Sequence, residues 1–229
     1  MPVKEYLEPE ETQQLEDAAT CLRDKLLIHL LARLGCRISE VLGIEVEHVD
    51  FARHQVTIEH LKTRFNLACP KCGARLGKAS VFCQKCGGKV EKAVTEAREF
   101  RRFRKLPVGP DTLHLLKVYI DRGGPRTING KTLLFNITRQ RAWQLFQEYS
   151  AKLGLPEIIN QETGKTHHVS PHKMRDAFAI HAMKVDDTGD GQRLLQEHLG
   201  HASFDTTAKY RKIAGKEHDD WYTRVMGEK

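Results

Sequence analysis

The chain has 229 residues, of which 40% are hydrophobic and 29% are charged, and its net charge is +7. This composition excludes a disordered chain, and the length fits one sizeable domain with an appendage. No stretch approaches the roughly 20 apolar residues of a membrane span, and the charged N-terminus lacks a signal-peptide core, so we expect a cytoplasmic protein.

The first third of the chain is predicted to contain three helices followed by a strand. Residues 8–19 place Pro9 at the first helical position, and residues 23–34 carry leucines at helical spacing. Gly35 should end the second helix in a left-handed conformation, and residues 37–43 form a short third helix. Apolar residues alternate in 54–62 and less regularly in 99–107, which predicts two strands of one hairpin.

The remainder is predicted to be helical. The expected helices cover residues 111–122, 138–154, 170–185, 192–200 and 203–213. Asp111, Thr138 and Ser170 are the expected N-caps, Gly154 is the expected stop, and 123–131 is expected to be a loop. The fold class is therefore mainly α with a small antiparallel β-sheet (α+β).

A cysteine-rich segment separates the two predicted strands. Two CxxC pairs, each followed by glycine, supply four candidate metal ligands: Cys69, Cys72, Cys83 and Cys86. Four thiolates form a closed tetrahedral zinc site with a structural role, and a unit this small rarely folds without a metal. A redox CxxC pair is the alternative. Cys21 and Cys36 lie outside this segment and are expected to be core thiols.

The positive charge is concentrated around the same segment. Residues 62–105 hold 13 Lys or Arg and three acidic residues, a net charge of +10, which leaves −3 for the rest. A basic segment on a nearly neutral body favours contact with a polyanion, most often nucleic acid. A solvated surface loop is the alternative.

Three distant segments carry cations or proton donors near predicted helix starts. Arg37 begins a short helix, His172 and Arg175 share a first turn, and His201 precedes a helix that contains Tyr210. Helix N-termini favour anions, and arginine adds a bidentate donor. If the three segments meet in space, these residues form a phosphate clamp beside a nucleophile.

In this order the motifs resemble the tyrosine recombinase (phage integrase) family. GCRISE is similar to the first arginine box, VTIEHLKTR to the strand that carries a lysine, HKMR to the HxxR box, and LGHASFDTTAKY to the LGH…Y box. The resemblance assigns six catalytic residues: Arg37, Lys62, His172, Arg175, His201 and Tyr210. Lys89, Lys92 or Lys105 could replace Lys62.

The resemblance implies a site-specific recombinase that cuts and rejoins double-stranded DNA without ATP or a catalytic metal. Tyr210 would form a 3′-phosphotyrosine while Arg37 and Arg175 hold the phosphate oxygens. Lys62 would protonate the leaving 5′-oxygen, His172 would help move the nucleophile's proton, and His201 would donate to the phosphate. The expected assembly is a synaptic tetramer on DNA in the nucleoid, with no membrane contact.

The resemblance also sets the domain boundaries. Residues 1–62 and 98–229 would form the catalytic domain, and 63–97 a zinc ribbon inserted in the hairpin, which would contact DNA or a neighbouring protein. The family's N-terminal clamp domain is not in the sequence, which indicates a minimal recombinase or a fragment. Asp176 stands where many relatives have histidine.

The rival functions are a type IB topoisomerase-like activity and a non-catalytic DNA-binding regulator.

Overall fold

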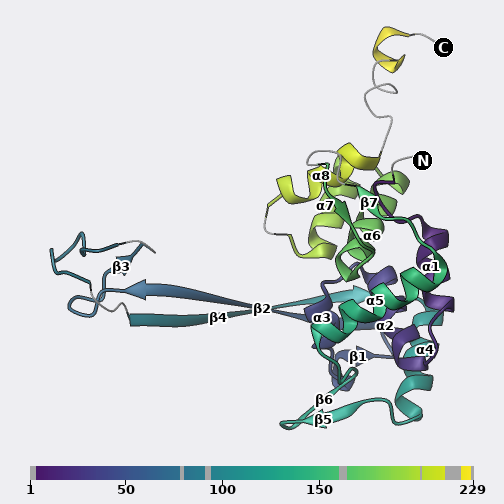
Figure 1. Ribbon diagram of the computed structural model, residues 1–229, viewed down its shortest axis with the longest axis horizontal. Coiled ribbons are helices and arrows are strands. Elements are labelled where there is room, and N and C mark those ends of the chain that lie inside the picture. The colour runs from purple at the N-terminus through teal and green to yellow at the C-terminus, as the bar shows by residue number, and fades with distance from the viewer. Residues whose placement is uncertain are drawn as a thin grey trace. The chain divides into compact units, whose positions relative to one another are not determined.

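The computed structural model describes residues 4–77, 80–90, 94–159, 164–201, 203–214 and 223–227. The chain divides into two compact units, one of residues 1–58 and 104–229 and the other of residues 59–103. The first unit is mostly helical with short antiparallel strands, as predicted (Figure 1). No helix among the described residues has the length and apolar character of a membrane span.

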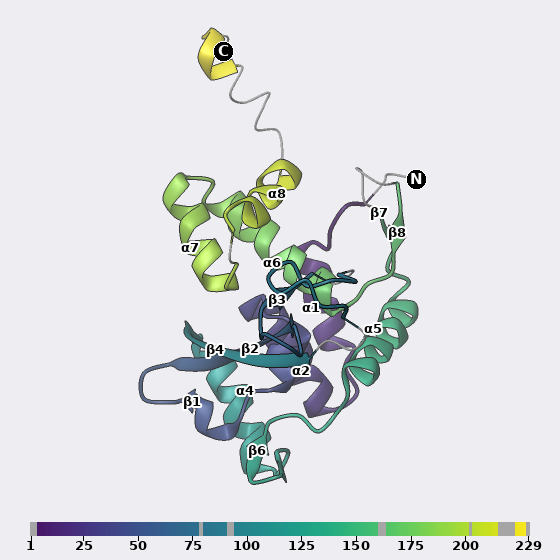
Figure 2. The ribbon, with the colours of Figure 1, turned by 90° about the vertical axis from the view of Figure 1, so that its left-hand side faces the viewer.

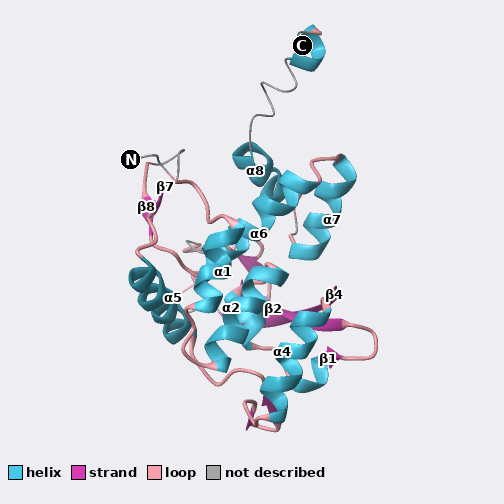
Figure 3. Ribbon diagram, turned by 90° about the vertical axis from the view of Figure 1, so that its right-hand side faces the viewer, coloured by secondary structure: helices cyan, strands magenta, loops and turns pink. Residues whose placement is uncertain are grey.

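The core of the helical unit is built around its second helix. Helix α2 (Leu22–Leu34) packs against α1 (Pro9–Asp17), α4 (Pro110–Asp121) and α6 (Pro171–Val185), and Figure 3 shows it among them. Its predicted apolar face is at most 1% exposed and comprises Leu26, Leu27, Leu30, Leu31 and Leu34. Gly35 ends the helix with a φ of 57°, in the left-handed region that was predicted.

The other helices of this unit are α3 (Ile38–Leu42), α5 (Arg139–Leu153), α7 (Gly189–Leu199), α8 (Asp205–Ala214) and the 3₁₀ turn Val46–His48. Helix α8 packs against α6 and α7, and the views in Figures 1 and 3 place the three helices side by side. A small apolar cluster joins them, which includes Ile180, Leu195, Leu199 and the ring of Tyr210. This packing fixes the helix that carries the predicted nucleophile.

The helix caps were predicted in part. Thr138 accepts a hydrogen bond from the Arg141 amide, and Gly154 ends α5 with a φ of 63°, so both predictions are confirmed. Asp111 is not a cap, because α4 begins at Pro110 after Gly109. Ser170 holds the N-cap position but its side chain makes no capping hydrogen bond. The starts of α7 and α8 were also misplaced, by three and two residues.

The strands are longer and more numerous than predicted. Strand β2 (Gln55–Ala68) pairs with β1 (Val49–Asp50), with β3 (Arg75–Leu76) and with β4 (Val94–Pro107). Figure 2 shows β2 beside β4. Two further antiparallel pairs were missed: β5 (Arg126–Ile128) with β6 (Lys131–Leu133), and β7 (Ile158–Ile159) with β8 (Thr166–His167).

The predicted loop at 123–131 is therefore wrong. Asn129 and Gly130 both have positive φ, 50° and 78°, and they join β5 to β6 as a two-residue hairpin turn. Asn-Gly is the residue pair that such a turn favours, because both central positions need the left-handed region.

The second unit holds the cysteine segment. A small apolar cluster forms there around Cys69, Leu76 and Cys83, with Leu67 and Val90 against it. The two free cysteines of the helical unit differ: Cys36 is buried as predicted, whereas Cys21 is exposed, so the prediction of a core thiol is wrong for Cys21.

Candidate active site and cysteine cluster

Arg175 is the most deeply buried cation of the predicted site, with 1% of its surface exposed. Its Nη1 donates to the carbonyl of Gly35 at 2.8 Å, and its Nη2 donates to the carbonyl of Leu199 at 2.9 Å. Burial, followed by the charge of Arg37, lowers the pKa of Arg175 from its usual value. The ends of α2 and α7 thus hold one guanidinium group in a fixed orientation.

His201 connects Arg175 to the last helix. Arg175 Nη2 lies 2.8 Å from His201 Nε2, and Thr207 Oγ1 lies 2.9 Å from Nδ1. Because arginine can only donate, Nε2 accepts this bond, and Nδ1 therefore carries the hydrogen and donates to Thr207. Burial and the nearby charges of Arg175 and Arg37 lower the pKa of His201 to about 4, so the ring is neutral at neutral pH.

Arg37 is oriented by a buried carboxylate. Its backbone amide donates to Glu40 Oε2 and its Nη1 donates to Oε1, both at 3.0 Å. Glu40 is 3% exposed and also accepts from Arg104 Nη2 at 2.7 Å. Burial opposes ionisation of Glu40, but the hydrogen bonds and charges of Arg104 and Arg37 outweigh it and lower its pKa to about 2. The side chain of Arg37 remains 37% exposed, which leaves it accessible to a ligand.

Tyr210 lies in the same group of residues. Its ring stacks on His201 with centroids 6.2 Å apart, and Lys209 Nζ lies 4.5 Å from the ring centroid. The hydroxyl donates to Asp176 Oδ1 at 2.9 Å. Burial raises the pKa of Tyr210 well above its usual range, and the charge and hydrogen bond of Asp176 raise it further.

The two remaining predicted residues are placed differently. His172 lies in the first turn of α6 with an exposed side chain, and loss of hydration around its ring lowers its pKa, an effect that the charge of Asp176 opposes. Lys62 lies on β2 in the second unit, and its side chain falls outside the described residues. The structure thus brings together Arg37, Arg175, His201 and Tyr210, with His172 on the same helix as Arg175.

Three residues of this group were not predicted as site residues: Arg104, Asp176 and Thr207. Asp176 was noted in the sequence only as a departure from the family pattern. Arg104 is one of several arginines in a basic strand, and Thr207 is an ordinary helix residue, so local sequence does not single them out. Their partners lie 64, 34 and 6 residues away along the chain.

The four cysteines of the second unit form one cluster. Their sulfur atoms all lie within 4.8 Å of one another, with Cys69 and Cys86 3.8 Å apart and Cys72 and Cys83 3.6 Å apart. The backbone amides of Cys86 and Lys85 lower the pKa of Cys83 to about 6. The sulfur atoms converge, and nearby backbone amides stabilise a thiolate. Both features make the cluster compatible with a metal site.

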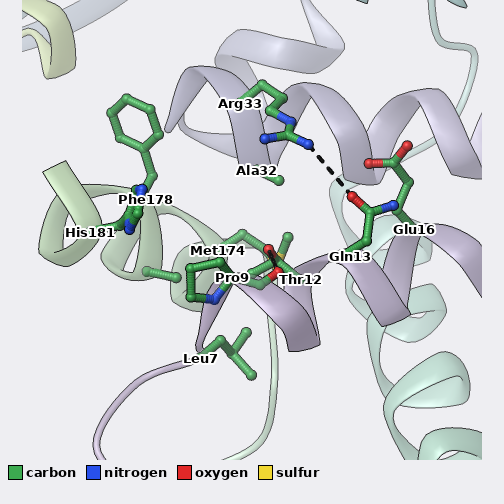
Figure 4. Close-up of a pocket in the computed structure, with 11 residues that line it drawn as sticks. Leu7, Pro9, Thr12, Gln13, Glu16, Ala32, Arg33, Met174, Phe178 and His181 are labelled. Atoms are coloured by element: carbon green, nitrogen blue, oxygen red, sulfur yellow. Dashed lines mark hydrogen bonds between the residues drawn. The ribbon is translucent and has the colours of Figure 1, made fainter. Parts of the chain in front are cut away.

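A separate hollow of about 90 Å³ lies between α1, α2 and α6 (Figure 4). Gln13 and Arg33 lie on one side of it, where Arg33 Nη2 donates to Gln13 Oε1 at 3.5 Å, and Phe178 and His181 lie on another. None of the predicted catalytic residues lines this hollow. The predicted catalytic residues with described side chains lie instead on α6 and α8, at the start of α3 and directly after α7.

Comparison with solved structures defines the class of the fold. The XerA recombinase superposes with a TM-score of 0.63 at 19% identity, covering 98% of this chain and 66% of that one. The Tn1549 transposon integrase, solved in complex with circular intermediate DNA, superposes with a TM-score of 0.60 at 18% identity, covering 100% of this chain and 66% of that one. The fold is that of tyrosine recombinase catalytic domains.

The sequence comparisons give the family. A model of the phage integrase family matches residues 5–217, and the chain belongs to that family. The tyrosine recombinase XerD of Neisseria meningitidis serogroup B is 27% identical over 201 residues, which cover 84% of this chain and 51% of XerD. The chain spans about half the length of the curated relatives it matches.

Proposed function

We propose that this chain carries the catalytic part of a tyrosine site-specific recombinase, which cleaves and rejoins DNA through a 3′-phosphotyrosine on Tyr210. The observation that supports the proposal most directly is the linked group of Arg175, His201 and Tyr210, with one hydrogen bond of 2.8 Å and one stacked ring pair. A phenol beside two guanidinium groups is the arrangement that attack on a phosphodiester needs.

The proposed roles follow from the environment of each residue. Arg175, held by two carbonyl groups, supplies a preoriented cation, and Arg37, partly exposed, closes on the other phosphate oxygen. Lys62 protonates the leaving 5′-oxygen and His172 assists proton movement, as the family resemblance implies. Both arginines offset charge that develops on the phosphate, so the proposed reaction requires no catalytic metal. The phosphotyrosine conserves the energy of the cleaved bond, so rejoining requires no ATP.

His201 has to change its hydrogen bonds during this reaction. Its Nε2 accepts from Arg175, whereas the proposed role is to donate to a phosphate. A phosphate between Arg175 and His201 would offset the positive charge that lowers the pKa of the ring. The imidazole would then take up a proton on Nε2 and donate, while Nδ1 keeps its bond to Thr207.

The proposed function is tested by trapping the covalent intermediate. The chain is incubated with nicked duplexes that carry candidate recombination sites, so that the 5′-product diffuses away after cleavage. Denaturing gels should reveal a protein–DNA adduct that Tyr210→Phe abolishes, while Tyr149→Phe, which alters another tyrosine at 6% exposure, retains it. An adduct that survives Tyr210→Phe would refute the assignment of the nucleophile.

We further propose that Cys69, Cys72, Cys83 and Cys86 hold one structural zinc ion. A tetrahedral site with zinc–sulfur bonds of about 2.3 Å has sulfur atoms about 3.8 Å apart, close to the observed 3.6 and 3.8 Å. Metal analysis of the purified chain should find one zinc per chain, and Cys72→Ser should lower this value. Residues 63–97 are accordingly proposed to be a zinc ribbon inserted in a catalytic domain of residues 1–62 and 98–229.

The ribbon is proposed to assist DNA binding, because residues 62–105 carry a net charge of +10. Neutralisation of DNA phosphates releases counterions, so the affinity should fall steeply with salt. Replacing 65–97 by a short turn should reduce that salt slope. An unchanged slope with weaker self-association would instead indicate a contact between protomers, as in the expected synaptic tetramer.

A further inference from the structure

We propose that Asp176 is the general base that removes the proton from the Tyr210 hydroxyl as its oxygen attacks the phosphate. The inference rests on the proposed function and deepens it, because the family resemblance gives proton movement to His172. It names a carboxylate at a position where many relatives have histidine.

The geometry of the pair supports this role. The Tyr210 hydroxyl donates to Asp176 Oδ1 at 2.9 Å, within the 2.6–3.2 Å reach of a general base. The two residues lie on α8 and α6, which pack side by side (Figure 3). Tyr210 is only 1% exposed, so the carboxylate rather than bulk water receives the proton.

A third group orients the base. Lys173 Nζ lies 3.7 Å from Asp176 Oδ2, the oxygen that Tyr210 does not use, and both side chains are about 15% exposed. A nucleophile bonded to a base, with the base oriented by a third group, is the arrangement that activates a hydroxyl. Among the described residues, His172 forms no hydrogen bond with Tyr210, and its side chain is exposed.

The proton and electrons balance in a single step. The O–H bond of Tyr210 breaks and an O–H bond forms on Asp176, while the phenolic oxygen forms a bond to phosphorus. The bond from phosphorus to the 5′-oxygen breaks, and that oxygen takes a proton from the general acid. Rejoining reverses the step, and Asp176 returns its proton to the departing phenolic oxygen.

The transfer has to be concerted with attack. The buried hydroxyl next to a carboxylate resists ionisation, as the raised pKa of Tyr210 indicates. A free phenolate is therefore not populated before DNA binds. The proton moves only as the new bond to phosphorus reduces the basicity of the phenolic oxygen.

The test compares single-turnover cleavage by the wild type and Asp176→Asn, which keeps the shape and an acceptor oxygen but loses basicity. The rate of adduct formation should fall about 100- to 10,000-fold, with DNA affinity unchanged. Asp187→Asn, an exposed aspartate outside the site, is the matched charge control and should cleave at the wild-type rate.

A second substrate separates the base from the general acid. In a duplex with a 5′-bridging phosphorothiolate, sulfur leaves without a proton, so loss of the acid no longer slows cleavage. Asp176→Asn should be slow on both substrates, because the attack by Tyr210 is common to them. Restoration of the wild-type rate on the sulfur substrate would overturn the proposal.

The outcomes distinguish this inference from the proposed function. Absence of any Tyr210-dependent adduct in the wild type refutes the proposed function itself. A wild-type adduct together with an equal or faster rate for Asp176→Asn refutes only the base, and a faster rate identifies Asp176 as a restraint on the tyrosine. If Asp176→Asn unfolds, Asp176→Glu and Asp176→Gln are compared, and the proposal requires the Glu variant to be faster.

Discussion

The pairing of Glu40 with Arg104 gives a quantitative prediction for Arg104→Met. Glu40 is 3% exposed, and its carboxylate accepts from Arg104 Nη2 at 2.7 Å and from Arg37 Nη1 at 3.0 Å. The difference between its pKa of about 2 and the ordinary value of 4.5 corresponds to about 3 kcal/mol. Removal of one partner from a buried pair commonly costs about 3–5 kcal/mol. Because Arg37 remains, we expect a loss of about 3 kcal/mol.

The pH dependence has a defined sign. The folded-state pKa of Glu40 lies below its unfolded value, so the stabilisation is present above about 4.5 and is lost as the pH falls towards about 2. In Arg104→Met this loss should be smaller, and the difference in stability from the wild type should shrink with falling pH. The Glu40→Gln Arg104→Met double variant should be more stable than the sum of the single losses predicts.

The assay is urea unfolding followed by circular dichroism at 222 nm, which reports the helices of the first unit. Arg102→Met removes an exposed arginine of the same strand and should change the stability by less than about 0.5 kcal/mol. A loss below about 1 kcal/mol in Arg104→Met, or an unchanged acid dependence, would show that Glu40 does not depend on this arginine.

Three further results are expected. Gly35→Ala should destabilise the chain by about 2 kcal/mol or more, because the residue has a φ of 57° and its Cβ would lie 2.4 Å from Phe178 Cδ1. Gly154→Ala, with a similar φ and open space around it, measures the backbone cost alone in the same unfolding assay. As the pH falls from 6.5 to about 4, the wild type should lose more stability than His201→Gln. The folded-state pKa of His201 is lowered, so protonation in this range favours the unfolded chain. Urea unfolding midpoints at pH 4.5 and 7 measure this difference. Chelation of the proposed zinc should expose the four-cysteine cluster to a thiol reagent, and zinc added back before the reagent should restore the protection.

Local signals predicted the helices well and the tertiary contacts poorly. Pro9, Thr138 and Gly154 each act through their own backbone or a neighbouring turn, so their effect is visible in a short stretch of sequence. The Asn129–Gly130 turn is equally local, but the prediction of a loop at residues 123–131 does not include this turn. The Asn-Gly pair is itself a short-range signal for a two-residue hairpin turn.

The contacts of the candidate site depend on distant segments. The bond from Tyr210 to Asp176 spans 34 residues, and the bond from Arg104 to Glu40 spans 64. No periodicity in the sequence determines which helix end faces which strand, because packing alone decides it. The family motifs predicted which residue types converge, but not that Asp176 rather than His172 holds the hydroxyl.

The alternation along β4 limits how the inserted segment can vary. Phe103 and Lys105 are exposed, whereas Arg104 is turned inward with Leu106, since neighbouring side chains on a strand face opposite sides. A shift of one residue in the pairing of β4 would turn Phe103 and Lys105 inward and direct Arg104 into solvent. Segments of very different size and chemistry could therefore replace the cysteine-rich segment, provided that the strand returns to the helical unit with its odd and even positions unchanged.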